Sequence, residues 1–330
     1  MRVKVPVLPK ILVIRFSSIG DIVLTTPVVR CIKKQLPGAE VHYLTKKEFV
    51  PLLLENPYID KVISIDKNVA EILDELRNGH YDFVVDLHHN LRSFQVKRGL
   101  KTASSSFPKL NIEKWLLVNL KVNRLPGIHI VDRYFQTVKK LNVANDGIGL
   151  DYFIPVADEV DTGLLPLTHR QGYIGFVIGA RHYTKQLPET KIISICRKIS
   201  SPIILLGGKA DFEKGEAVSK ALGSRVYNAC GKYNIGQSAS LVRQANKIIT
   251  HDTGLMHIAA AFKKDIISVW GNTIPAFGMY PYMPGAHSQI VEVEGLSCRP
   301  CSKIGYKACP KKHFKCMMLI DEEKIAAHAG

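Results

Sequence analysis

The first group of residues that could do chemistry comes directly after an apolar run at residues 11–16. It comprises Ser17, Ser18, Gly20 and Asp21, at the point where a buried strand would turn into a helix. The carboxylate of Asp21 can cap that helix. In an α/β domain the same carboxylate stands beside the ligand site, where it can take a proton from an attacking hydroxyl group. The residues alone leave both roles open and favour the cap.

A second polar segment, again between an apolar run and a helical pattern, holds Asp252, Thr253, Gly254 and His257. The free amides at the start of this helix would offer a diphosphate both hydrogen-bond donors and the positive end of the helix dipole. In the alternative interpretation, Asp252 and Thr253 cap the helix and His257 packs one turn later. The combination of residues is more informative than any one of them.

Two further loops carry side chains suited to a nucleotide. The loop after the apolar run at 173–178 contains Arg181 and Lys185, which can meet phosphate oxygens as a planar fork and a point charge. Exposed basic loop residues are also common without a ligand. The turn that follows residues 203–206 contains Asp211 and Glu213, either of which can bond a ribose hydroxyl or cap the next helix.

Four of the seven cysteines lie close together near the carboxyl end of the sequence: Cys298, Cys301, Cys309 and Cys316. Four thiolates can hold a tetrahedral zinc ion, and His313 is a substitute ligand, but only the first pair has familiar ligand spacing. Reduced structural thiols are the competing interpretation, and a disulfide or an iron–sulfur cluster is a third. Zinc therefore enters as a candidate structural metal.

The elements that must position these residues alternate along the whole chain. Short β-branched apolar runs alternate with longer amphipathic stretches, which is typical of βα units building a parallel sheet. Among the amphipathic stretches, residues 21–35, 115–122 and 212–222 are predicted to form helices. A chain of 330 residues favours two domains, which we place at residues 1–160 and 161–330 on either side of a polar, proline-bearing stretch. Both halves are predicted to be doubly wound α/β domains, with the ligand site in a cleft between them.

The composition indicates the charge of the partners but does not identify any one of them. Lys and Arg number 45 against 29 Asp and Glu, a net charge of +16 that favours anionic partners. The amino-terminal segment lacks the apolar core of a signal peptide, because the run at residues 11–16 is short and is interrupted by Arg15, so we expect a cytoplasmic protein. A basic, zinc-containing nucleic-acid-binding protein would explain only the cysteine segment and the charge, and no basic motif interleaved with aromatic residues is visible, so no nucleic-acid partner is expected.

The order of these motifs resembles a known family. Residues 14–27, residues 252–257 and the run Trp270, Gly271, Asn272 and Thr273 are similar to the ADP-heptose:lipopolysaccharide heptosyltransferases, glycosyltransferase family nine. The similarity extends through nearly the whole chain, and the cysteine pattern looks like that of one branch. The resemblance implies a GT-B fold, in which two Rossmann-like domains face a cleft.

The resemblance also implies an activity and its parts. It implies inverting heptose transfer from ADP-heptose to a lipid-linked, anionic inner-core sugar acceptor at the cytoplasmic membrane face, with no metal or other cofactor required for catalysis. The first domain would bind the acceptor and the second the nucleotide sugar. Asp21 would be the general base beside the acceptor-side loop of Ser17, Ser18 and Gly20. The donor would be held by residues on the second domain: Arg181, Lys185, Asp211, Glu213, Asp252, Thr253, Gly254 and His257.

One departure from the family pattern makes the sugar less certain than the fold. The family often has more hydroxyl residues where Gly179, Ala180 and Arg181 stand, so the phosphate contacts are expected to shift toward Arg181. The alternatives are a related transferase that uses another nucleotide sugar, or an epimerase or binding protein on the same architecture.

Overall fold

The computed structural model describes residues 8–330, and they form two compact units. The first unit contains the residues up to 109 together with 128–153, and the second contains 110–127 together with 154–330. The sequence-based division placed the boundary at 160 and kept 110–127 in the first domain, whereas those residues pack with the second unit. The amino-terminal segment, on which the expectation of no signal peptide rests, lies partly outside the described residues.

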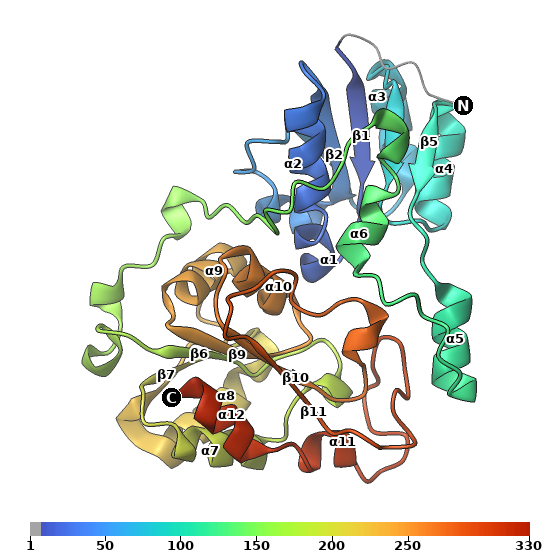
Figure 1. Cartoon of the computed structure of the whole chain (residues 1–330). Coiled ribbons are helices and arrows are strands. Elements are labelled where there is room, and N and C mark those ends of the chain that lie inside the picture. Colours follow the sequence, from blue (N-terminus) through green and yellow to red (C-terminus); the bar gives the residue numbers. More distant parts are fainter. Residues whose placement is uncertain (1–7) are drawn as a thin grey trace. The chain divides into compact units, whose positions relative to one another are not determined.

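The first unit is built on a parallel sheet whose order along the sheet is β3-β2-β1-β4-β5 (Figure 1). Its strands are β1 (Lys10–Ile14), β2 (Glu40–Lys46), β3 (Lys61–Ile65), β4 (Phe83–Asp86) and β5 (Ser104–Ser106). The direction in which successive strands are added to the sheet reverses between β1 and β4, which are hydrogen-bonded neighbours. Ligands of open α/β sheets bind outside the carboxyl ends of the strands at such a switch point.

The helices of this unit differ in one respect from the sequence prediction, which placed a single helix over 21–35. They are α1 (Ile19–Val23), α2 (Thr26–Gln35), α3 (Leu73–Asn78), α4 (Leu91–Leu100) and α6 (Ile130–Phe135). The predicted helix is broken because Pro27 has no N–H to donate to Val23. The hydroxyl of Thr26 donates to the Val23 carbonyl instead, at 2.8 Å, and α2 begins afresh.

The second unit repeats the architecture with one more strand. Its strands are β6 (Ile174–Val177), β7 (Ile203–Leu206), β8 (Val226–Asn228), β9 (Lys247–His251), β10 (Ile266–Trp270) and β11 (Gln289–Glu292). They are all parallel in the order β11-β10-β9-β6-β7-β8, so the switch point lies between β6 and β9. This is the strand order of a dinucleotide-binding fold.

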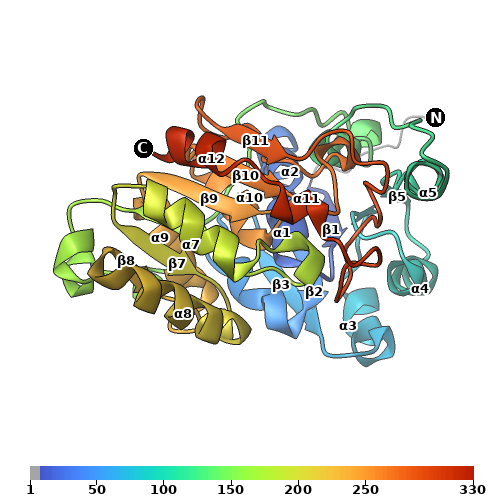
Figure 2. The same cartoon turned by 90° about the horizontal axis from the view of Figure 1, so that it is seen from below.

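Helices cover both faces of the second sheet (Figures 1 and 2). One face carries α9 (Ile235–Gln244) and α10 (Gly254–Ala261), and the other carries α7 (Glu189–Lys198), α8 (Phe212–Leu222) and α12 (Glu322–Ala329). The strands β6, β7 and β10 are buried on both faces, which explains why their sequences are continuous apolar runs rather than alternating ones.

Two smaller elements complete the second unit. The helix α5 (Asn111–Leu120) was expected at 115–122, and α11 (Lys315–Met318) lies in the cysteine segment. Between residues 8 and 330, no helix is both long and apolar enough to cross a membrane.

Candidate functional site

Asp21 lies at the carboxyl edge of the first sheet, one turn into α1. Ser18 is the N-cap residue, and its hydroxyl donates to Asp21 Oδ2 at 2.7 Å while its amide donates to the same oxygen at 3.2 Å. The capping role considered from the sequence is therefore present. The two cap hydrogen bonds occupy only part of the Asp21 carboxylate, because a carboxylate has about four acceptor positions. The Asp21 side chain is 21% exposed.

Arg15 holds the other oxygen of this carboxylate. Its Nη2 lies 2.6 Å from Asp21 Oδ1, and its remaining donors reach the carbonyls of Ser17 and Leu87 and the hydroxyl of Tyr134. Burial alone would lower the pKa of Arg15, but Asp21, through its charge and its hydrogen bond, together with Tyr134 and Tyr43 outweighs burial, and the net pKa is raised. The guanidinium therefore stays charged and links the ends of β1 and β4 around Asp21.

His88 lies close enough to Arg15 and Asp21 for both charges to act on its imidazole ring. It follows β4, and burial together with the charge of Arg15 lowers the pKa of His88 to about 3. Its buried Nδ1 has no hydrogen-bond partner among the described residues. A buried lone pair costs less than a buried unpaired N–H, so the neutral ring should carry its proton on Nε2 and act as a donor.

Asp86 positions the loop that carries His88. This carboxylate is fully buried at the end of β4 and accepts from the amides of His88 and His89. Lys97 forms an ion pair with it at 2.9 Å. Burial would raise the pKa of Asp86, but Lys97 and the His89 amide lower it, so the loop is tied to an ionised group.

In the second unit, Lys185 and Asp252 meet across the switch point. Lys185 follows β6, Asp252 follows β9, and Lys185 Nζ lies 2.5 Å from Asp252 Oδ2. Thr273, which follows β10, donates to the same oxygen at 3.0 Å. Three loops that are distant in sequence therefore converge on one carboxylate at the carboxyl edge of the sheet.

The helix α10 begins directly beside this carboxylate. Thr253 is its N-cap residue but makes no side-chain cap, because its hydroxyl lies 3.3 Å from that of Thr250. Gly254 is the first helical residue, and His257, 2% exposed, lies one turn further on. The first amides of α10 are thus not capped by the N-cap side chain, which suits an anionic ligand.

The remaining predicted donor residues divide into two groups. Asp211 lies at the end of β7, where its carboxylate accepts from the Gly208 amide at 2.9 Å and packs against the backbone of Gly179. Arg181 and Glu213 are exposed, and within the described part of the chain their side chains make no hydrogen bond or ion pair. The structure does not bring these two residues to Lys185 or Asp252.

The cysteine segment is not arranged as a metal site. Among residues 8–330, no group of three or more His, Cys, Asp or Glu side chains is placed so that it could hold a metal ion. Cys298, Cys301, Cys309 and Cys316 do not form zinc-site geometry in this structure, and zinc at these four residues stays a prediction. Cys316 packs in the apolar core, where burial raises the pKa of its thiol to about 11 and keeps it protonated.

This segment instead supports the donor-side loops. Arg299 donates to the carbonyls of Gly271 and Thr273, on both sides of the loop after β10. The amide of Thr184, the residue before Lys185, donates to the Tyr306 carbonyl, and the Tyr306 amide donates to the Thr184 hydroxyl oxygen. The sequence prediction missed this role, because no spacing pattern links Arg299 to the loop 26 to 28 residues earlier or Tyr306 to Thr184, 122 residues earlier.

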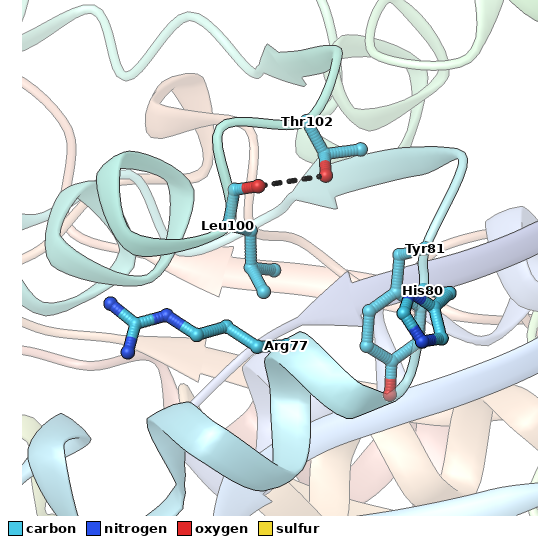
Figure 3. Close-up of a pocket in the computed structure, with 5 residues that line it drawn as sticks. All are labelled: Arg77, His80, Tyr81, Leu100 and Thr102. Carbon is cyan, nitrogen blue, oxygen red and sulfur yellow. Dashed lines mark hydrogen bonds between the residues drawn. The ribbon is translucent and has the colours of Figure 1, made fainter.

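A cavity of about 340 Å³ lies elsewhere on the first unit (Figure 3). It is lined by Arg77, His80, Tyr81, Leu100 and Thr102. Tyr81 and Thr102 precede β4 and β5, so this cavity is at the amino edge of the sheet, opposite Asp21. None of the predicted site residues lines this cavity.

Arg15, His88 and Thr273 are site residues that sequence reasoning missed. Arg15 had been taken only as an interruption of an apolar run. The available signal was a lone charge at the carboxyl end of a buried strand, where side chains face the ligand edge. His88 offered a related signal, because it is a polar side chain two residues after the end of β4.

Comparison with known proteins agrees with this architecture. The family model described as glycosyltransferase family 9 (heptosyltransferase) matches residues 69–312. The chain is 25% identical over 292 residues to lipopolysaccharide heptosyltransferase 1 of Campylobacter coli, covering 80% of this chain and 84% of the relative.

Solved structures share the fold at lower identity. The E. coli ADP-heptose lps heptosyltransferase II superposes with a TM-score of 0.72 at 20% identity, covering 97% of each chain. The E. coli heptosyltransferase WaaC with ADP-2-deoxy-2-fluoro heptose gives a TM-score of 0.63 at 19% identity, covering 87% of this chain and 94% of that chain. The predicted α/β fold with two Rossmann-like sheets of the GT-B type is confirmed.

Proposed function

Because the chain belongs to glycosyltransferase family 9, the heptosyltransferase family, we propose that it transfers heptose from ADP-heptose to a lipopolysaccharide inner-core acceptor. The names of the relatives support this donor and this acceptor class. The observation that carries the proposal is the pair of polar clusters at the two switch points, Arg15 with Asp21 and Lys185 with Asp252.

Asp21 is the general base in this proposal. As the acceptor oxygen attacks the anomeric carbon, its proton passes to Asp21, the new C–O bond forms, and the bond from the anomeric carbon to the diphosphate breaks. A single in-line displacement of this kind inverts the anomeric configuration. Arg15 and Ser18 hold the carboxylate in one orientation, and the neutral His88 donates a hydrogen bond to the acceptor sugar.

The leaving ADP carries the charge that must be stabilised on the donor side. We assign this role to the ammonium of Lys185 and to the amides of Thr253 and Gly254 at the start of α10. His257 lies one turn behind them. These groups take the place of a divalent cation, so the proposed transfer does not depend on a metal.

Two residues change partners when the donor binds. In the structure, Lys185 is paired with Asp252. Diphosphate would draw Lys185 away, which frees Asp252 for the transferred sugar, while Asp211 is placed beside β7 for the ribose. Arg181 and Glu213, both exposed, would join the donor only as the loops rearrange around it.

The test is ADP release from ADP-heptose by the purified protein in EDTA, with and without a Kdo-lipid acceptor. We expect acceptor-dependent release that D21N reduces by about 10²-fold or more, since general-base catalysis contributes about 10²–10⁴-fold. ADP affinity should be unchanged in the variant. The matched control is D74N, an exposed carboxylate on α3 paired with Arg77, which should leave release unchanged.

Release that is independent of acceptor, or that survives in D21N, would contradict the assignment of Asp21. Release that disappears in EDTA and returns with Mg²⁺ would contradict the proposed metal independence.

A further inference from the structure

Asn272 is a buried amide whose hydrogen-bonding groups are unused. Its side chain follows β10 and is 1% exposed, yet neither Nδ2 nor Oδ1 has a hydrogen-bond partner in the described structure. Buried polar side chains are nearly always paired in native proteins. An amide left with both ends unsatisfied therefore calls for a partner that the chain itself does not supply.

The backbone around Asn272 is held on both sides, so the amide is fixed in place. Arg299 binds the carbonyls of Gly271 and Thr273, which flank it. The backbone nitrogen of Asn272 lies 3.5 Å from the carbonyl oxygen of Thr184. Gly271 packs so closely against Met317 and Thr184 that a Cβ there would lie 2.5 Å from the Met317 methyl carbon. Several contacts therefore hold this one loop in place.

The strand order places Asn272 at one end of the donor. Asp211 follows β7, Lys185 follows β6, Asp252 follows β9 and Asn272 follows β10, in that spatial order. Neighbouring strands are about 4.8 Å apart, so β7 and β10 are separated by roughly 14 Å. With the ribose beside Asp211 and the diphosphate at Lys185 and α10, the loop after β10 lies on the side of the transferred sugar.

The chemistry of the amide selects the kind of group it meets. A diphosphate can only accept hydrogen bonds, so it would satisfy Nδ2 and leave Oδ1 facing negative charge. A pair of sugar hydroxyls satisfies both ends, one accepting from Nδ2 and the other donating to Oδ1. Asp252, held beside this loop by Thr273, can accept from a further hydroxyl.

We propose that Asn272 binds hydroxyl groups of the sugar in the nucleotide-sugar donor and thereby selects which sugar is transferred. This inference rests on the proposed function and deepens it by assigning a residue to sugar selection. A site built to hydrogen-bond hydroxyls rejects a donor that lacks them, because its own polar groups are then left unpaired.

The experiment compares the affinities of ADP-heptose and ADP, measured by calorimetry without acceptor, for the wild type and N272A. The sugar is present only in the first ligand, so the two proteins and two ligands form a thermodynamic cycle. We expect N272A to weaken ADP-heptose about tenfold and to change ADP affinity less than twofold, since one or two hydrogen bonds are lost with the sugar alone.

Unfolding measurements separate this role from a structural one. Removing an amide that has no partner in the protein should not lower the denaturation midpoint of N272A. The matched control is N228A: Asn228 is 2% exposed, but its amide bonds the Phe212 carbonyl and Glu216, so N228A should be less stable.

Equal weakening of both ligands by N272A, or weakening of neither, would overturn the inference. Its failure is distinguishable from that of the proposed function. If the wild type transfers heptose and N272A binds both ligands normally, only the role of Asn272 is lost. If the wild type binds neither ADP nor ADP-heptose, the proposed function fails and this inference fails with it.

Discussion

At the scale of single residues, Arg15 shows how one side chain can organise a catalytic group. It is 7% exposed and spreads its donors over Asp21, two backbone carbonyls and Tyr134. A lysine cannot reproduce this fork, because its ammonium is a single point charge on a flexible stem. The position therefore requires the guanidinium shape as well as the charge.

We expect R15K to lower kcat/KM for heptose transfer by about 10- to 100-fold, because Asp21 is no longer held in one orientation. ADP affinity, which depends on the second unit, should stay within about twofold of wild type. Steady-state kinetics and calorimetry measure the two effects. K10R, on the same strand but at its amino end, is the control. Wild-type kcat/KM in R15K would show that the orientation of Asp21 does not depend on Arg15.

At the scale of elements, α5 presents its apolar side outward. Ile112, Trp115 and Leu120 are 73%, 56% and 57% exposed, whereas Lys121 turns toward the protein and donates to the carbonyl of Pro300. An exposed apolar helix face carrying a tryptophan suits the interfacial region of a membrane. The net charge of +16 favours an anionic surface and opposes the approach of a second copy.

We therefore expect the wild type to bind vesicles that contain phosphatidylglycerol, and the triple variant I112S/W115S/L120S to bind them at least tenfold more weakly. Vesicle sedimentation at low and raised salt measures both contributions. The control V156S/L164S/L167S removes three apolar side chains outside α5 that are even more exposed, and it should bind as the wild type does. Equal loss in both triple variants would mean that α5 has no special role at the membrane.

At the scale of the whole molecule, histidines kept neutral should make stability depend on pH. Burial, with the charge of Lys214 second, lowers the pKa of His251 to about 3, and burial also lowers the pKa of His42, His88 and His169. An unfolded histidine titrates near pH 6.5. As the pH falls below that value, the unfolded chain gains protons that the folded chain does not, so stability decreases.

We expect the free energy of unfolding to fall between pH 7 and pH 5, with each fully excluded proton contributing about 1.4 kcal/mol per pH unit. His251 accepts from the Leu187 amide, and in H251Q the glutamine oxygen can take that role without titrating. The pH dependence should therefore be shallower in H251Q than in the wild type, as measured by urea unfolding. The same slope in both proteins would show that His251 is protonated in the folded state.

Local patterns were enough for most strands, but not for β5 and not for every helix. The run at 203–206 coincides with β7, and the helix predicted at 212–222 coincides with α8. The helix predicted over 21–35 is broken at Pro27, and β5, made of three serines, has no apolar signal at all. That strand exists because its backbone pairs with β4, a contact that no local pattern encodes.

The sequence by itself determined the two α/β halves, the family resemblance and the loops that carry Asp21, Lys185 and Asp252, because buried parallel strands and helix starts have local signatures. Only the tertiary structure decided which of these loops meet. Strand order brings Lys185 to Asp252 over a separation of 67 residues, and Leu87 to Arg15 over 72. It also made the cysteine segment a support for the donor loops. Such contacts depend on which strands become neighbours, and that is a property of the folded sheet rather than of any stretch of sequence.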